Sequence, residues 1–180
     1  MVEIRFHGRG GQGTVVASKA LADALMMEGK WVQTFPEYGV ERRGAPVVSF
    51  TRIDDKRIYL RCKIYQPDHV LVMDPTLLEV VDVTDGLKSG GWLIINSEKR
   101  PDHLRLTDKF KVRTFDATSL AVKYGLGSKA APIVNMPMLG AFAKITGLLG
   151  LETLLDAVRE ESPIKKEENV KAAREAYESA

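Results

Sequence analysis

A cluster of glycines near the amino terminus is the stretch of this sequence best suited to binding an anion. It reads Gly8-Arg9-Gly10-Gly11-Gln12-Gly13-Thr14, and three of its glycines have the G-x-G-x-x-G spacing. Between a strand and a helix, such glycines permit a tight turn, close approach of a ligand to the backbone and close helix–strand packing. The helix that follows would direct free N–H groups at the loop, which suits a phosphate. The alternative is a tight turn with no ligand.

The flanking residues predict the elements that this motif requires. Residues 2–7 alternate apolar and charged side chains, which is the period of a strand. Residues 15–27 are rich in Ala, Leu, Val and Met, and Lys19 and Asp23 are their only charges. We therefore expect a helix from about Gly13 to Glu28, and a second strand at Trp31–Phe35 completes a β-α-β unit.

A dinucleotide site would need one further residue, an acid that ends the second strand about 20 residues past the glycines. Glu37 is the nearest candidate, but it lies beyond a proline. Arg9 and Gln12 also place long polar side chains in the loop. A free-standing NAD- or FAD-dependent oxidoreductase is therefore only the alternative interpretation. The sequence also counts against it because nothing in the chain supplies a proton-transfer constellation or a substrate domain.

The loop at residues 36–46 is a second candidate for function. Two prolines and two glycines exclude a regular element there, while Tyr38, Glu41, Arg42 and Arg43 crowd its middle. Together with Arg9, the two arginines could donate charge-assisted hydrogen bonds to phosphates. They could equally form salt bridges with a neighbouring subunit, and Glu41 could neutralise them. Tyr38 could stack on an adenine or pack at an interface, where tyrosines are enriched.

The composition limits the classes of protein that remain. The 180 residues carry a net charge of +2, which predicts one globular domain over residues 1–180 and argues against nucleic acid as the main partner. Cys62 is the only cysteine, so a disulfide and an iron–sulfur cluster are excluded within this chain. The three histidines have no metal-ligand spacing, and no apolar run reaches the ~18 residues of a membrane span. No signal peptide is evident, which predicts a cytoplasmic protein without a membrane partner.

The remaining pattern alternates strands with helices. Further strands are predicted at residues 47–53, 69–73, 92–96 and 112–115, with a hairpin return strand at 57–63. Helices are predicted at residues 76–83 after Asp74, 117–123 after Asp116, 136–146 after Asn135, 151–160, and from Ser162-Pro163 to about residue 179. We expect an α/β fold: a Rossmann-like mixed, mostly parallel sheet with helices on its faces and a helical C-terminal third.

Three stretches together resemble one family. They are Gly8–Gly13, the run Phe35–Pro46 and the run Asn135-Met136-Pro137-Met138-Leu139-Gly140-Ala141, with Asp74-Pro75 between them. Their order and spacing are similar to those of the gamma subunit of pyruvate:ferredoxin oxidoreductase and related 2-oxoacid:ferredoxin oxidoreductases. The version at residues 40–46 resembles the pyruvate type, and gamma subunits for branched-chain 2-oxoacids such as 2-oxoisovalerate look similar.

The resemblance implies a subunit of a cytoplasmic complex that converts a 2-oxoacid to the acyl-CoA with electrons passed to ferredoxin. Thiamine diphosphate, magnesium and iron–sulfur clusters would lie in the alpha, beta and delta subunits, and coenzyme A would be the cosubstrate. This chain would hold no cofactor and no catalytic residue by itself, and alone it would be inactive. It would assist assembly and help to bind or gate coenzyme A, or serve as a purely structural module. The candidate binding residues are Gly8, Arg9, Gly10, Gly11, Gln12, Gly13, Thr14, Tyr38, Glu41, Arg42, Arg43 and Asn135.

Overall fold

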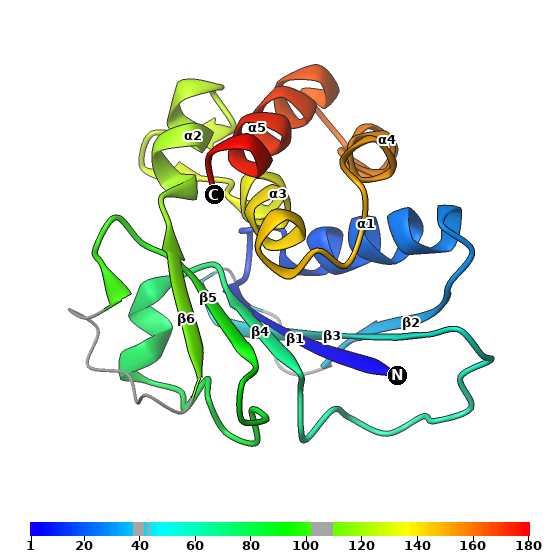
Figure 1. Ribbon diagram of the computed structural model, residues 1–180. Helices are drawn as coiled ribbons and strands as arrows, with labels where there is room; N and C mark the ends of the chain where they lie inside the picture. Colours follow the sequence, from blue (N-terminus) through cyan, green and yellow to red (C-terminus); the bar gives the residue numbers. More distant parts are fainter. Residues whose placement is uncertain (38–41, 43, 102–109) are drawn as a thin grey trace.

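The computed structural model describes residues 1–37, 42, 44–101 and 110–180. Six strands form one mixed sheet in the order β2-β3-β1-β4-β5-β6 (Figure 1). In chain order they are β1 (Val2–Arg9), β2 (Trp31–Pro36), β3 (Pro46–Asp54), β4 (His69–Val72), β5 (Trp92–Asn96) and β6 (Lys111–Phe115). The helices are α1 (Thr14–Met27), the 3₁₀ helix η1 (Pro75–Glu79), α2 (Ala117–Lys123), α3 (Asn135–Thr146), α4 (Leu151–Glu161) and α5 (Lys166–Ser179), and a small hairpin joins β7 (Gly127–Ser128) to β8 (Ala131–Pro132).

The sheet is covered on both faces, as expected for the central parallel strands β4 and β5, whose residues are mostly apolar. Figure 1 shows α1, α3, α4 and α5 on one side of the sheet, with η1 on the other. Alternate residues of the strands supply two cores. Phe6, Leu71 and Ile94 belong to the core under α1 and α3, whereas Val72 and Ile95 pack with Leu77 of η1. The predicted α/β class, with a mixed and mostly parallel sheet and a helical C-terminal third, is confirmed.

The strand β3 lies between the two strands of the predicted β-α-β unit. It pairs antiparallel with β1 on one side and with β2 on the other, so β1 and β2 run parallel but are not neighbours. The unit β1-α1-β2 is therefore split by an inserted strand. This also explains why the predicted return strand at residues 57–63 is wrong. Both edges of β3 are already paired, so a hairpin partner has no edge to join, and the segment contains no strand.

Smaller differences concern the helix ends. Asp74 does cap a helix, by accepting a hydrogen bond from the Thr76 N–H at 3.0 Å, but the helix is 3₁₀ and ends at Glu79. The last helix starts at Lys166 rather than at Ser162-Pro163, because Ser162 is the C-cap of α4. In the part of the chain that the structure describes, no helix is both long enough and apolar enough to cross a membrane.

Candidate functional site

The glycine loop lies between the end of β1 and the start of α1. Gly11 and Gly13 have φ angles of +95° and +80°, in the region that favours glycine. The loop is fastened to the entry of β3: the Gly10 N–H donates to the Ala45 carbonyl at 2.9 Å, and the Gly44 N–H donates to the Gly10 carbonyl at 3.0 Å. The structure thus holds the loop open beside the first turn of α1, whose N–H groups have no acceptor within the helix.

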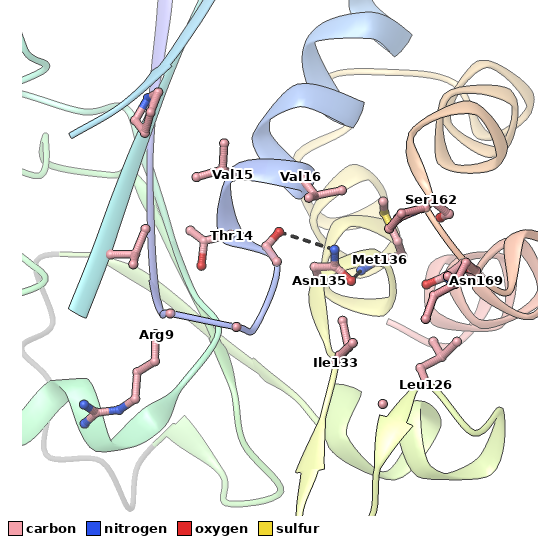
Figure 2. A pocket seen from close by; sticks show the side chains of 18 of the residues that line it. Arg9, Thr14, Val15, Val16, Leu126, Ile133, Asn135, Met136, Ser162 and Asn169 are labelled. Carbon is pink, nitrogen blue, oxygen red and sulfur yellow. Dashed lines mark hydrogen bonds between the residues drawn. The ribbon is translucent and has the colours of Figure 1, made fainter. Parts of the chain in front are cut away.

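Gln12 and Arg9 stabilise this loop from within. The Gln12 side chain accepts a hydrogen bond from the Arg9 N–H at 2.7 Å and donates one to Asp74 at 2.9 Å. The Arg9 guanidinium donates to Thr76 Oγ1 at 2.7 Å and to the Gly44 carbonyl at 3.0 Å, and it lies 3.2 Å from Asp74. Burial opposes ionisation of Asp74, but the hydrogen bonds from Thr76 and Gln12, with Arg9 nearby, hold the pKa of its carboxyl below the ordinary value. Figure 2 shows Arg9 directed away from Asn135 and Ile133.

Asn135 links the start of α3 to the start of α1, across 122 positions of sequence. Its side-chain amide donates to the Gly13 carbonyl at 3.3 Å, and its Oδ1 accepts from the Met136 N–H at 2.9 Å (Figure 2). A Cβ atom on Gly13 would lie 2.4 Å from Asn135 Nδ2, and one on Gly8 would lie 2.0 Å from Thr14 Oγ1. Two of the loop glycines are therefore required by close packing.

A pocket of about 640 Å³ opens at this junction. One wall is the glycine loop with the first turn of α1, and a second comes from β2 and β3 with Arg42. The opposite wall is C-terminal. Its residues come from the region before and at the start of α3, from the connection between α4 and α5 and from the first turn of α5: Leu126, Gly127, Ile133, Asn135, Met136, Ser162, Pro163, Ile164, Lys165 and Asn169. Figure 2 shows the labelled members of both walls around one space.

Charged residues line each side of the pocket: Arg9 in the glycine loop, Glu37 and Arg42 on the side of β2 and β3, and Lys165 on the C-terminal wall. Arg42 is exposed, and Glu37 forms an ion pair with Lys63. The facing wall contributes the aliphatic side chains of Leu126, Ile133 and Ile164. Such a pocket suits a ligand with an anionic part near the loop and an uncharged, flexible part against the aliphatic wall. Within the described residues, no group of three His, Cys, Asp or Glu side chains is placed to hold a metal ion.

The predicted site residues fall into three groups. Arg9, Gly10, Gly11, Gly13, Thr14, Arg42 and Asn135 line the pocket. Gly8 and Gln12 support the loop from behind. Tyr38, Glu41 and Arg43 lie outside the described residues.

The sequence did not reveal the C-terminal wall. Ser162-Pro163 has the pattern of a helix start, yet it contributes to the pocket wall where α4 ends. Leu126 and Ile133 look like ordinary core residues, and they reach the pocket because the short β7–β8 hairpin brings them together. The signal in the sequence was the apolar run around Asn135, which is itself one of the predicted binding residues.

These features define a class of protein: a Rossmann-like α/β fold that presents a glycine loop, a helix N-terminus and an aliphatic wall to a ligand. The arrangement differs from a standard dinucleotide site. Because β3 separates β2 from β1, the end of β2 lies two strand spacings, about 10 Å, from the glycine strand. Glu37, the candidate ribose-binding acid, is also paired with Lys63.

Comparison with known proteins gives the family. Residues 3–179 match the model of the pyruvate ferredoxin/flavodoxin oxidoreductase family, and the chain belongs to that family. It is 52% identical, over 99% of its length and 96% of the relative, to the pyruvate/ketoisovalerate oxidoreductases common subunit gamma of Thermococcus litoralis. It is also 52% identical to the pyruvate synthase subunit PorC of Methanocaldococcus jannaschii, over 98% of this chain and 96% of the relative.

A solved structure supports the fold. The crystal structure of the pyruvate oxidoreductase subunit PORC from Thermotoga maritima superposes with a TM-score of 0.82 at 37% identity, covering 98% of this chain and 95% of that one. The resemblance inferred from the three sequence stretches is confirmed.

Proposed function

We propose that this chain is the gamma subunit of a pyruvate or related 2-oxoacid:ferredoxin oxidoreductase, and that its pocket helps to bind or enclose coenzyme A. The family, and relatives of similar length named gamma subunit and PorC, support the first part. One relative is named as common to pyruvate and ketoisovalerate oxidoreductases. We therefore assign the choice of 2-oxoacid to the other subunits rather than to this one.

The observation that carries the second part is the meeting of three distant stretches at one pocket. The glycine loop, Arg42 and Asn135 come from widely separated parts of the sequence and line the same space. Coenzyme A has phosphates at one end and a flexible pantetheine arm at the other. Backbone N–H groups at a helix N-terminus and an arginine suit the phosphates, and an aliphatic wall suits the arm.

In this proposal the redox chemistry belongs to partner subunits. An iron–sulfur cluster of the usual type needs four thiolates, and this chain has only Cys62. When bound in the neighbouring subunits, thiamine diphosphate would supply the decarboxylation chemistry and the clusters would carry electrons. The work left to this chain is binding: the loop and Arg42 hold the anionic end of the cosubstrate, and the aliphatic wall excludes water from its arm.

The test is Arg42→Ala in the assembled complex. Loss of one partly exposed charge-assisted hydrogen bond should raise the apparent KM for coenzyme A by about 3- to 10-fold, with little change in the maximal rate. Arg113→Ala is the matched control, since Arg113 is exposed on β6 and does not line the pocket. Ile133→Ala should give a smaller increase by trimming the aliphatic wall.

A purely structural module is the second candidate, favoured by the internal contacts that occupy Arg9 and Gln12. It predicts intact assembly and an unchanged KM in both Arg42→Ala and Ile133→Ala. That result would remove the coenzyme A role and leave the subunit assignment standing. Failure of the wild-type chain to co-purify with a thiamine-binding partner would overturn the assignment itself.

A further inference from the structure

The segment that joins β3 to β4 carries concentrated positive charge. Residues 56–67 contain four basic side chains and no acid: Lys56, Arg57, Arg61 and Lys63. Lys63 is paired with Glu37. Within the residues that the structure describes, the other three form no ion pair.

The acids next to this segment do not neutralise it. Asp54 lies 3.3 Å from the N-terminal amine, Asp55 lies 2.6 Å from Lys30, and Asp68 lies 2.8 Å from Lys88. Each of the three carboxylates is therefore matched to a cation outside residues 56–67. Among the described residues, the segment therefore keeps a net positive charge at the surface.

Its backbone is anchored although it contains no strand. In Figure 1 it passes beneath the sheet, on the side away from α1 and α3, as the trace between β3 and β4. Arg52, only 1% exposed, donates to the Lys63 carbonyl at 3.1 Å. Ile64 is buried, and the Tyr65 carbonyl packs so closely on Gly86 that a Cβ there would lie 1.8 Å from it. These contacts anchor the end of the segment, residues 63–65, and the residues that need no ordering there lower the entropic cost of binding.

The side chains that point outward have the composition of an interface. Tyr59 is 77% exposed, Tyr65 is 70% exposed and Leu60 is 46% exposed, all within seven residues. The Arg57 guanidinium lies 5.5 Å from the centre of the Tyr59 ring. Tyrosine and arginine are enriched at interfaces and dominate their binding energy, because both combine a large apolar surface with a polar end.

We propose that residues 56–65 dock onto an acidic surface of another subunit of the same complex. The proposal rests on the assignment of this chain as a subunit. Charge complementarity identifies the partner: Lys56, Arg57 and Arg61, which form no ion pair with any described residue, suit carboxylates, and the exposed tyrosines and Leu60 suit a protein surface that can pack against them. Nucleic acid is the poorer match, since the chain has 26 basic and 24 acidic residues and no broad basic field.

The first test is Arg57→Glu/Arg61→Glu in the complex, isolated through a tag on a different subunit. Both substitutions would place new carboxylates against the carboxylates of the partner, and such like-charge contacts weaken binding by more than tenfold. Recovery of this chain with the complex should therefore fall at least tenfold. Lys129→Glu/Lys171→Glu is the matched control, because both lysines are exposed and belong to other elements, the β7–β8 turn and α5. All four positions are exposed, so thermal unfolding of each isolated variant should match the wild type.

The second test locates the contact directly. A zero-length carbodiimide reagent joins an amine only to a carboxylate that touches it, and Lys56 should be cross-linked to an Asp or Glu of another subunit. Amine labelling of Lys56 should be slower in the complex than in the isolated chain. Full recovery of Arg57→Glu/Arg61→Glu, or equal labelling of Lys56 in both states, would overturn the proposal. If the wild-type chain still co-purifies with the complex, neither of these two results would affect the assignment of this chain as a subunit.

Discussion

At the scale of single residues, Gly13 meets two requirements at once. Its φ of +80° places it in the left-handed region, and Asn135 occupies the space where a side chain would begin. Gly29, at the other end of α1, has nearly the same φ of +79°, but no atom lies within 4 Å of the position that its Cβ would occupy. Comparing the two positions therefore separates two effects: both glycines avoid backbone strain, but only Gly13 also avoids a steric clash.

We predict that Gly13→Ala destabilises the protein more than Gly29→Ala. Left-handed backbone costs a residue with a Cβ about 1–2 kcal/mol, which both variants share. Displacing Asn135 adds roughly 1–3 kcal/mol in Gly13→Ala alone. Urea unfolding of the two variants measures the difference. In an Asn135→Ala background the added cost of Gly13→Ala should largely vanish; a cost unchanged by that background would show that Asn135 is not its cause.

His7 gives a pH-dependent prediction. It is 4% exposed on β1, and burial, with the Arg5 charge nearby, lowers its pKa from 6.5 to about 3. Between these values the unfolded chain binds a proton that the folded chain does not. Stability should therefore fall as the pH drops from 6.5 towards 3, by up to about 1.4 kcal/mol per pH unit from this residue.

The measurement is urea unfolding at several pH values for the wild type and for His7→Leu, which cannot titrate at this position. The difference in unfolding free energy between them should shift in favour of His7→Leu as the pH falls below 6.5. His69, whose pKa is also lowered by burial, is present in both proteins and cancels in the comparison. Parallel pH profiles would mean that His7 titrates normally in the folded chain.

At the scale of elements, the packing of α3 on α5 depends on a missing side chain. A Cβ on Gly140 would lie 2.2 Å from the Ala173 carbonyl oxygen, so the two helices approach at backbone distance. The C-terminal wall of the pocket includes the start of α3 and residues just before and within α5. The small residues at this contact therefore set the distance between α3 and α5, and with it the position of the C-terminal wall.

We predict that Gly140→Ala destabilises the chain by about 1–3 kcal/mol, through overpacking against a backbone atom. The sign is the informative part, since Gly→Ala inside a helix ordinarily stabilises by about 1 kcal/mol. Lys171→Ala, on the exposed side of α5, should change the free energy of unfolding by only about 0.5 kcal/mol or less. Ala173→Gly should not rescue Gly140→Ala, because the clash is with the main chain; a rescue would place the conflict in side chains instead.

The elements were largely predictable, and the exceptions share a cause. Local patterns located the strands of the sheet and the helices α1 to α4, and the predicted caps Asp74 and Asp116 formed. The predicted cap Asn135 is wrong: it lies inside α3, whose N-cap is Val134, and its side chain bonds to the Gly13 carbonyl and the Met136 N–H. The hairpin strand at residues 57–63 failed because β3 had both edges occupied, which only the pairing order reveals. The C-terminal wall of the pocket was missed for the same reason: Ile133 and Ser162 acquire a role only when long-range packing brings them to the glycine loop.

At the scale of the whole molecule, the pocket joins the two halves of the chain. The glycine loop and Arg42 belong to the first 42 residues, and Ile133, Asn135 and Asn169 belong to the last 50. A direct hydrogen bond, Asn135 to the Gly13 carbonyl, already connects them. A ligand held between both walls would add contacts to each half, and its binding energy would stabilise both together.

Coenzyme A should accordingly slow amide hydrogen exchange on both sides of the pocket in the assembled complex. At a concentration 100 times its Kd the linkage amounts to about 2.7 kcal/mol, and residues 10–16 should gain protection together with residues 126–136 and 162–165. Residues 56–65 are the internal reference, since they lie outside the pocket and should exchange at unchanged rates. In Arg42→Ala the protection at a fixed concentration should be reduced on both walls alike, because one ligand causes both effects. Protection confined to residues 10–16 would restrict the ligand to the helix N-terminus and exclude the C-terminal wall from the site.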